Sequence, residues 1–182
     1  SGVYASKLIA PEYRGQLEKV PLLSEKGLNL ETIIASGADF IFAGWGYGFR
    51  PDEITPDMLR EFGIHSYILS ESCIRIGGRH TPVSLEDTFT DLLNLGRIFR
   101  VEARAEEVVR QQRSELEKTR VMLQAVTRHP RVFVYDSGES IPLTTGRYTI
   151  THAMIEAAGG HNIFSDLVDS WVGANWEDVV HR

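Results

Sequence analysis

The chain has 182 residues, 42% of them hydrophobic and 24% charged, which is enough for one large globular domain or two small lobes. The net charge of −6 argues against a nucleic-acid partner, and no apolar run approaches the roughly 18 residues of a membrane-spanning helix. The single cysteine, Cys73, excludes an internal disulfide and a CxxC motif, and the opening SGVYASKLIA shows no signal-peptide pattern.

The first half of the chain alternates between predicted helices and predicted strands. Asn29 and Thr55 are good N-cap residues, each directly before an apolar helical stretch, and Gly63 is placed to end the second helix. The expected elements are helices over residues 30–36 and 55–62 and strands over residues 39–43 and 65–69. This alternation predicts an α/β architecture with a parallel sheet.

Two consecutive helices are predicted in the middle of the chain. The first covers residues 84–99, where Ser84 and Asp87 form the pattern of a capping box. The second covers residues 101–126, which contain neither Gly nor Pro and would extend about 38 Å at 1.5 Å per residue. Its heptad pattern is poor, so we expect a strut between two lobes, with a coiled-coil element as the alternative.

The last third of the chain repeats a pattern of the first half. A strand over residues 131–135 and a helix over residues 150–158 precede a second short helix over residues 176–180, capped by Asn175. The helix over residues 30–36 leads into the buried strand predicted over residues 39–43. The helix over residues 176–180 has no such strand after it, because the chain ends there. We therefore expect the last strands of the fold to be missing here. The first strand is also expected to be missing, because the chain starts without an obvious strand pattern.

These features together resemble the solute-binding proteins of bacterial ABC importers, specifically the class with a rigid interdomain helix that carries iron-siderophores, cobalamin, haem and some metals. The stretches that carry the resemblance are LNLETIIASGADFIFAGW, DLLNLGRIFRVEARAEEVV, RVFVYDSG, and AAGGHNIFSD with WEDVV, in the family's order. The resemblance implies two Rossmann-like α/β lobes, over residues 1–100 and 129–182, joined by one long α-helix over residues 101–128.

The resemblance also implies a way of working. The protein would be a monomer and no enzyme, with no cofactor of its own, that captures a small molecule and delivers it to a dimeric ABC permease in the membrane. It would be extracytoplasmic, either periplasmic or anchored to the cell surface as a lipoprotein. In this family each lobe presents a surface carboxylate to arginines of the permease, and Glu31 and Glu177 match those positions. The alternative is that both residues merely favour a helix N-terminus.

The ligand is expected in a cleft between the lobes, near the carboxyl ends of the strands. Each candidate taken alone could be a core, rim or solvated residue, but the aromatic and arginine side chains together suit a planar, anionic ligand. The candidates are Trp45, Tyr47, Phe49, Arg50, Glu71, Arg75, Arg79, Asp136, Arg147, Tyr148 and Trp171. The family resemblance implies that such a ligand would be an iron-siderophore or a corrinoid, or, by the narrower resemblance below, a deazaflavin.

A narrower resemblance, carried by FAGWGYGF, YILSESC and LLNLGRIF, is to an actinobacterial subgroup that imports a deazaflavin coenzyme precursor. Other classes of function fit less well. A metal-ion carrier remains an alternative, although the six histidines are scattered. A Rossmann-like enzyme is disfavoured because GWGYGF is not G-x-G-x-x-G and GESIP is not G-x-S-x-G. The mixed charge of the long helix disfavours a pure interaction protein.

Overall fold

The computed structural model describes residues 10–24, 29–43, 54–76 and 81–182, without the side chains of Ala43, Arg75 and Ile76. The chain forms two compact units, Ser1–Ile68 and Leu69–Arg182, and each is described by itself. This division follows contacts within the chain and does not test the predicted lobe boundaries, which remain a prediction.

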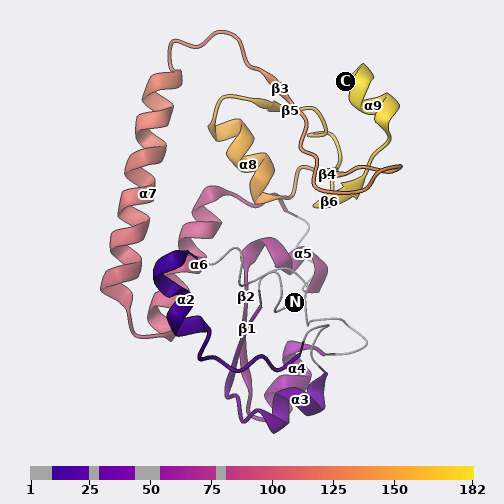
Figure 1. Cartoon of the computed structure of the whole chain (residues 1–182). Helices are drawn as coiled ribbons and strands as arrows, with labels where there is room; N and C mark the ends of the chain where they lie inside the picture. The colour runs from indigo at the N-terminus through magenta and orange to yellow at the C-terminus, as the bar shows by residue number, and fades with distance from the viewer. Residues whose placement is uncertain (1–9, 25–28, 44–53, 77–80) are drawn as a thin grey trace. The chain divides into compact units, whose positions relative to one another are not determined.

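The first unit contains a two-stranded parallel sheet with short helices (Figure 1). Its described elements are α2 (Pro11–Leu17), α3 (Leu30–Ala35), β1 (Phe40–Ala43), α4 (Pro56–Glu61) and β2 (His65–Ile68). The strands pair from Phe40 opposite His65 to Ala43 opposite Ile68. The core of this unit comprises Ile33, Ile54, Leu59 and Ile64. The predicted order of helix, strand, helix and strand is thus confirmed.

Local chemistry explains where these helices begin and end. The Asn29 side chain accepts the backbone N–H of Thr32 at 2.8 Å, and Thr55 accepts that of Met58 at 3.2 Å. Gly63 follows α4 with a φ of +75°, a left-handed conformation that glycine adopts without steric cost. No helix was predicted before residue 30, although Pro11 occupies the first turn of α2, where proline fits.

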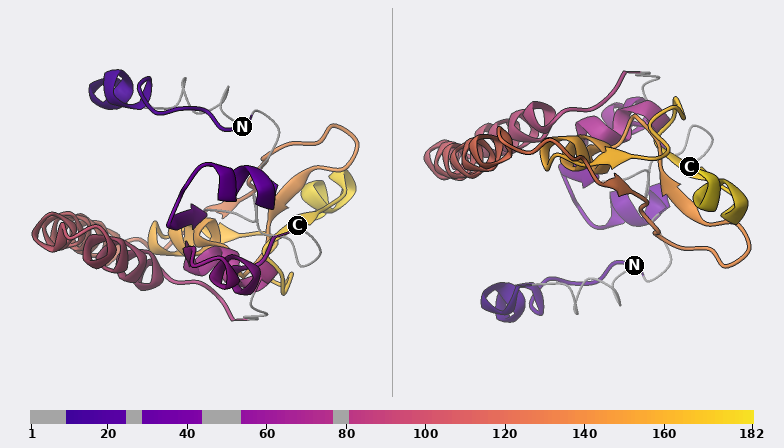
Figure 2. Two further views of the ribbon diagram at one scale, coloured as in Figure 1. Left: turned by 90° about the horizontal axis from the view of Figure 1, so that it is seen from below. Right: turned by 90° about the horizontal axis from the view of Figure 1, so that it is seen from above.

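The second unit contains a helical hairpin, two short pairs of strands and two further helices. Its described elements are η1 (Ser70–Ser72), α5 (Cys73–Ile76), α6 (Leu85–Ile98), α7 (Glu102–Leu123), β3 (Arg131–Val132), β4 (Leu143–Thr145), α8 (Ile150–Ala157), β5 (His161–Asn162), β6 (Trp171–Gly173) and α9 (Trp176–His181). β3 and β5 are parallel, whereas β4 and β6 are antiparallel. Figure 2 shows these elements from below and from above.

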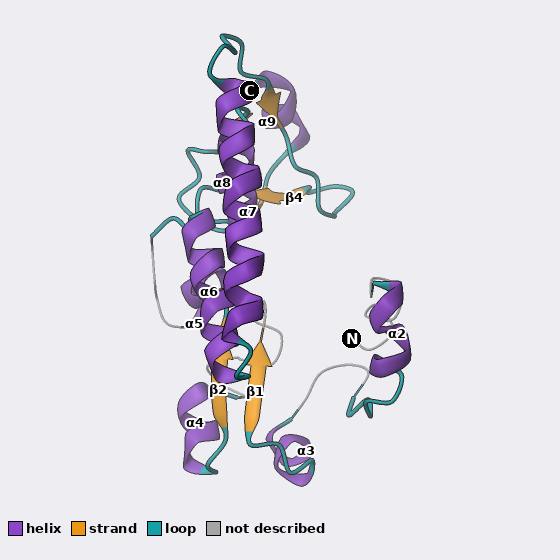
Figure 3. Cartoon of the chain, turned by 90° about the vertical axis from the view of Figure 1, so that its left-hand side faces the viewer, coloured by secondary structure: helices purple, strands orange, loops and turns teal. Residues whose placement is uncertain are grey.

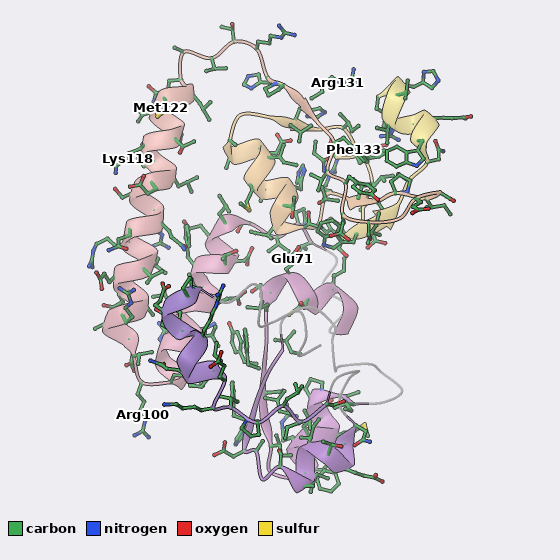
Figure 4. All side chains as sticks on the ribbon, in the orientation of Figure 1. Glu71, Arg100, Lys118, Met122, Arg131 and Phe133 are labelled. Atoms are coloured by element: carbon green, nitrogen blue, oxygen red, sulfur yellow. The ribbon has the colours of Figure 1, made fainter. Side chains whose placement is uncertain are left out.

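Helices α6 and α7 lie side by side in the second unit (Figure 3). Gly96 allows their close approach, because a Cβ there would lie 2.5 Å from the Cβ of Ala105. The Arg113 guanidinium lies 5.3 Å from the centre of the Phe89 ring and pairs with the Glu86 carboxylate. Arg100, labelled in Figure 4, joins the helices with a φ of +56°.

The capping box of Ser84 and Asp87 is confirmed, and α7 is a continuous helix of 22 residues, slightly shorter than predicted. Within the second unit α7 packs against α6 and α8. Its predicted role as a strut between lobes stays a prediction. None of the described helices is long and apolar enough to cross a membrane.

Candidate functional site

The position of Glu71 in the second unit is fixed by its neighbour Ser70 in η1 and by a hydrogen bond of its own carboxylate. The backbone N–H and hydroxyl of Ser70 donate to the Asp91 carboxylate of α6 at 2.9 and 2.8 Å, which anchors η1. The Glu71 carboxylate then accepts the backbone N–H of Ile150, the first residue of α8, at 3.1 Å. Figure 4 shows the Glu71 side chain near the start of α8. A free N–H at a helix start is a natural partner for a carboxylate.

Burial raises the pKa of the Glu71 carboxyl above the ordinary value of a glutamate, and the hydrogen bond from Ile150 opposes this only in part. The folded state therefore holds the proton more tightly than the unfolded state. The stabilisation that this proton gives is present at acid pH and is lost as the pH rises through the raised pKa.

We therefore expect the Glu71→Gln variant to gain free energy of unfolding relative to the wild type as the pH rises from about 4 to about 7. Glutamine can still accept the Ile150 N–H without carrying a charge. Urea denaturation at several pH values measures the difference, and Glu106→Gln on the exposed face of α7 controls for the loss of one carboxylate. A difference that does not change with pH would contradict the proposed burial cost.

Buried Asn162 positions the segment between β4 and α8. Its Nδ2 donates to the carbonyl oxygen of Thr145 at 3.0 Å, and its Oδ1 accepts the backbone N–H of Phe164 at 3.0 Å. The Thr145 and Thr149 hydroxyls hydrogen-bond to one another in the same buried layer. Asn162 lies in the AAGGHNIFSD stretch that carries the family resemblance, and its burial could not be inferred from the sequence.

Three of the predicted ligand residues are brought together by this segment. The backbone N–H groups of Arg147 and Tyr148 donate to the carbonyls of Leu167 and Asp169 at 2.8 and 2.9 Å. Trp171 lies opposite Thr145 in the β4–β6 pair. The exposed Arg147 side chain donates from Nε to the carbonyl oxygen of Ser165 at 2.7 Å. The structure thus places Arg147, Tyr148 and Trp171 along one strip of backbone.

The individual environments of these residues differ. Tyr148 is only 9% exposed and belongs to the core of the second unit, whereas Arg147 is exposed and Trp171 is half-buried. Burial lowers the pKa of the nearby His152, whose Nδ1 lies 3.4 Å from the Asn162 side-chain nitrogen. A neutral His152 can accept a hydrogen bond from that nitrogen. The role of each residue in ligand binding stays a prediction.

Asp136 lies at the opposite end of β4 from Arg147. Its backbone N–H donates to the carbonyl of Leu143 at 3.0 Å, and its carboxylate accepts the Ser137 hydroxyl at 3.0 Å. Tyr135 beside it and Trp176 of α9 are 52% and 42% exposed, and their ring centres are 5.8 Å apart. This aromatic pair was not predicted, although Trp176 stands directly before Glu177 in the sequence.

The structure does not describe the side chains of the remaining predicted ligand residues. Trp45, Tyr47, Phe49, Arg50 and Arg79 lie outside the described residues. Arg75 belongs to α5, but its side chain is not described. The predicted cleft between lobes therefore stays a prediction. Among the residues that the structure describes, no three His, Cys, Asp or Glu side chains gather to hold a metal ion.

Glu31 and Glu177 occupy equivalent places in two nearly identical helix starts. Each follows an asparagine N-cap by two residues, in α3 and in α9. The Asn29 backbone has φ −105° and ψ 164°, and the Asn175 backbone has φ −117° and ψ 155°. Asn175 accepts the Asp178 N–H at 2.6 Å, just as Asn29 accepts that of Thr32. The repeat seen in the sequence is thus a repeat of local structure.

Glu31 and Glu177 were predicted either to dock on a permease or merely to favour a helix N-terminus. Other carboxylates at the same helix position help to separate these two interpretations. Asp57 of α4 pairs with Arg60 at 2.7 Å, and Glu86 of α6 pairs with Arg113. Glu31 and Glu177 are exposed, and neither pairs with a side chain in the described ranges. Glu12 of α2 is also without such a pair, but its helix has no side-chain cap. The two Asn-capped carboxylates are thus available to an outside partner.

Comparison with known proteins gives one family and several similar structures. A family described as periplasmic binding protein matches residues 2–182. A periplasmic binding protein from Veillonella parvula DSM 2008 is 28% identical, with a TM-score of 0.77 over 95% of this chain and 56% of that chain. No curated protein gives a significant match.

Two further structures show the same fold at lower identity. An ABC-type Fe3+-hydroxamate transport system from Saccharomonospora viridis DSM 43017 is 22% identical, with a TM-score of 0.75 over 96% of this chain and 59% of that chain. A periplasmic heme-binding protein from Roseiflexus sp. RS-1 is 21% identical, with a TM-score of 0.66 over 90% and 59%. The chain therefore spans somewhat more than half the length of these structures.

Proposed function

This chain belongs to the periplasmic binding protein family, and from that premise we propose that it acts as the solute-binding component of an ABC importer. The predicted family and the predicted α/β fold class are confirmed by the family match and by the similar structures. The family implies an extracytoplasmic location. Whether the protein is free or lipid-anchored stays a prediction, as does its monomeric state.

The observation that carries the proposal is the family match along residues 2–182, and the paired helix starts add to it. Exposed Glu31 and Glu177 each sit in the first turn of an Asn-capped helix. An exposed carboxylate in this position can accept a bidentate pair of hydrogen bonds from an arginine. Two such carboxylates, one in each compact unit, suit a permease built from two related subunits. Such charge pairs mainly contribute orientation and association rate.

For the ligand we propose a ferric siderophore or a similarly large, anionic, cofactor-like molecule. The support is chemical: Arg147 is an exposed cation on the strip that also carries Trp171, and guanidinium and indole groups suit anionic, conjugated ligands. The names of similar structures mention Fe3+-hydroxamate and heme, which belong to the same broad class. Corrinoids and the deazaflavin precursor stay as narrower alternatives. We propose no catalytic reaction.

A fluorescence titration tests the ligand class. The full-length protein should lose tryptophan emission on addition of a ferric hydroxamate, hemin, a corrinoid or a deazaflavin, because Trp45 and Trp171 are predicted ligand contacts. Trp171→Phe should reduce the signal, and free N-acetyltryptophanamide controls for light absorption by the coloured ligands. If none of the four compounds changes the emission, the proposed ligand class is wrong.

A further inference from the structure

Trp176 joins the start of α9 to the segment that follows β3. Its indole Nε1 donates to the carbonyl oxygen of Glu139 at 2.7 Å. Its ring lies edge-on to Phe133, with ring centres 5.9 Å apart and an interplanar angle of 72°. Tyr135 covers another side at 5.8 Å. Trp176 is the first residue of α9, so these contacts are made directly beside Glu177.

The loop over residues 136–142 is closed on itself by two backbone hydrogen bonds. The Asp136 N–H donates to the Leu143 carbonyl at 3.0 Å, and the Leu143 N–H donates to the Ser137 carbonyl at 2.7 Å. Gly138 has a φ of +88°, and a Cβ there would lie 2.1 Å from the Ile141 carbonyl oxygen. A turn this tight leaves the loop little freedom to change its internal shape.

The same loop has a second attachment just ahead of α9. The Ala174 N–H donates to the carbonyl of Pro142 at 2.9 Å. Gly173 approaches the Ile141 side chain so closely that a Cβ would lie 2.9 Å from it. Phe133 in turn packs edge-on against the buried Phe164, with ring centres 6.0 Å apart. The loop is therefore attached to the residues just ahead of α9, whereas the segment that leads into it is anchored to the core through Phe133.

We propose that Trp176 is a positioning residue that couples the loop over residues 136–142 to Glu177. The proposal rests on the function proposed above, in which Glu177 contacts the permease, and on the ligand contact predicted for Asp136. A ligand that shifts Asp136 moves the Glu139 carbonyl, and the indole passes that displacement to the first turn of α9. By thermodynamic linkage, docking at Glu177 then changes ligand affinity by the same factor as ligand changes docking affinity.

The physical link is tested first, without any ligand. In the full-length Trp176→Phe protein the ring contacts remain but the hydrogen bond to Glu139 is lost. Backbone amides over residues 136–143 and 174–178 should then exchange about fivefold faster with deuterium, because one hydrogen bond contributes to holding them closed. Val180→Ala, on the same helix at a side chain 80% exposed, is the matched control and should leave exchange unchanged. Unchanged exchange in Trp176→Phe overturns the proposal.

The coupling is tested with the permease in lipid nanodiscs. Ferrioxamine B and hemin serve as the ligand probes. In the wild type, the bound probe should change the affinity for the permease by about fivefold or more, the usual range for coupled sites. In Trp176→Phe that ratio should fall toward one while affinity for the probe stays within about threefold, a difference worth one ordinary hydrogen bond.

Each outcome of the nanodisc experiment is informative. A ratio that Trp176→Phe leaves intact overturns the coupling. A wild type that never binds the permease overturns the proposed function and the coupling with it. Faster exchange in that case would still show that Trp176 holds the loop, so the two failures are distinguishable.

Discussion

Replacing both Glu31 and Glu177 with lysine should abolish uptake through the permease while ligand affinity stays unchanged. Both carboxylates are exposed at Asn-capped helix starts and pair with no side chain in the described ranges. Lysine would turn two attractive contacts with permease arginines into repulsive ones, which costs several kcal/mol at an interface. Loss of the favourable helix-end charge should lower stability by only about 0.5 kcal/mol per site.

The chain offers controls at the same helix position. Asp57 of α4 and Glu86 of α6 are also the second residue of a capped helix, and both are exposed. Asp57→Lys and Glu86→Lys together impose the same charge change and break only surface ion pairs, which contribute little to stability. Uptake assays beside ligand-binding assays on both double variants decide the matter. Equal loss of uptake in the control, or parallel loss of ligand binding in Glu31→Lys/Glu177→Lys, contradicts the docking role.

Replacing Gly146 with alanine should unfold the second unit more readily, by roughly 3 kcal/mol. A Cβ at this position would lie 2.5 Å from the Asp169 carbonyl oxygen, 2.9 Å from that of Leu167 and 3.0 Å from that of Ser170. These carbonyls accept the N–H groups of residues 146–148 at 2.6 to 2.9 Å. The obstacle is backbone, which no side-chain rotation can move aside, so all three hydrogen bonds must lengthen.

Gly15→Ala is the matched control for this prediction. Gly15 lies in exposed α2, and no atom lies within 4 Å of an added Cβ. Alanine favours a helix over glycine, so this variant should be as stable as the wild type or slightly more stable. Denaturant midpoints of the full-length variants measure both effects. A Gly146→Ala midpoint equal to that of the wild type would show that the segment ahead of Tyr148 is looser than described.

Residues with strong local preferences allowed accurate prediction from the sequence. Asn29, Thr55, Ser84 and Asn175 each cap the helix that was expected of them, because a side-chain oxygen and the nearby N–H groups suffice for that contact. The apolar run FIFA likewise forms a parallel strand, although its expected burial is wrong for Phe42, which is 48% exposed. The caps depend only on neighbouring residues, and the strand was recognisable from its own apolar run although its partner β2 begins only at His65.

Elements that depend on distant partners were missed. β4 and β6 are short strands whose residues show no alternation, and they exist because residues 143–145 meet residues 171–173. The predicted strand over residues 131–135 is paired only over Arg131–Val132, because β5 is equally short. No helix was predicted over residues 70–76, yet η1 and α5 form there and the Asp91 carboxylate fixes the first turn. Such pairings are long-range and leave no local pattern.

The residues of the candidate site also divide into those that were recognisable from neighbouring sequence and those whose contacts depend on distant partners. The family pattern and the capped helix starts made Glu31 and Glu177 recognisable from sequence, and the structure reproduces their shared geometry. The Glu71 contact with α8 joins residues 79 positions apart, and the Trp176 contact with Glu139 joins residues 37 positions apart. Neither could be inferred from spacing. Tyr148 was chosen as a polar aromatic residue, and its burial is a property of tertiary packing.

Native mass spectrometry of the full-length protein, purified from its own host, tests the central claim most directly. The account predicts a bound species that leaves on denaturation and has the mass and visible absorbance of a ferric chelate, a tetrapyrrole or a deazaflavin. A protein that carries no such species, and that also acquires none when mixed with these compounds, would contradict a role in capturing this class of ligand.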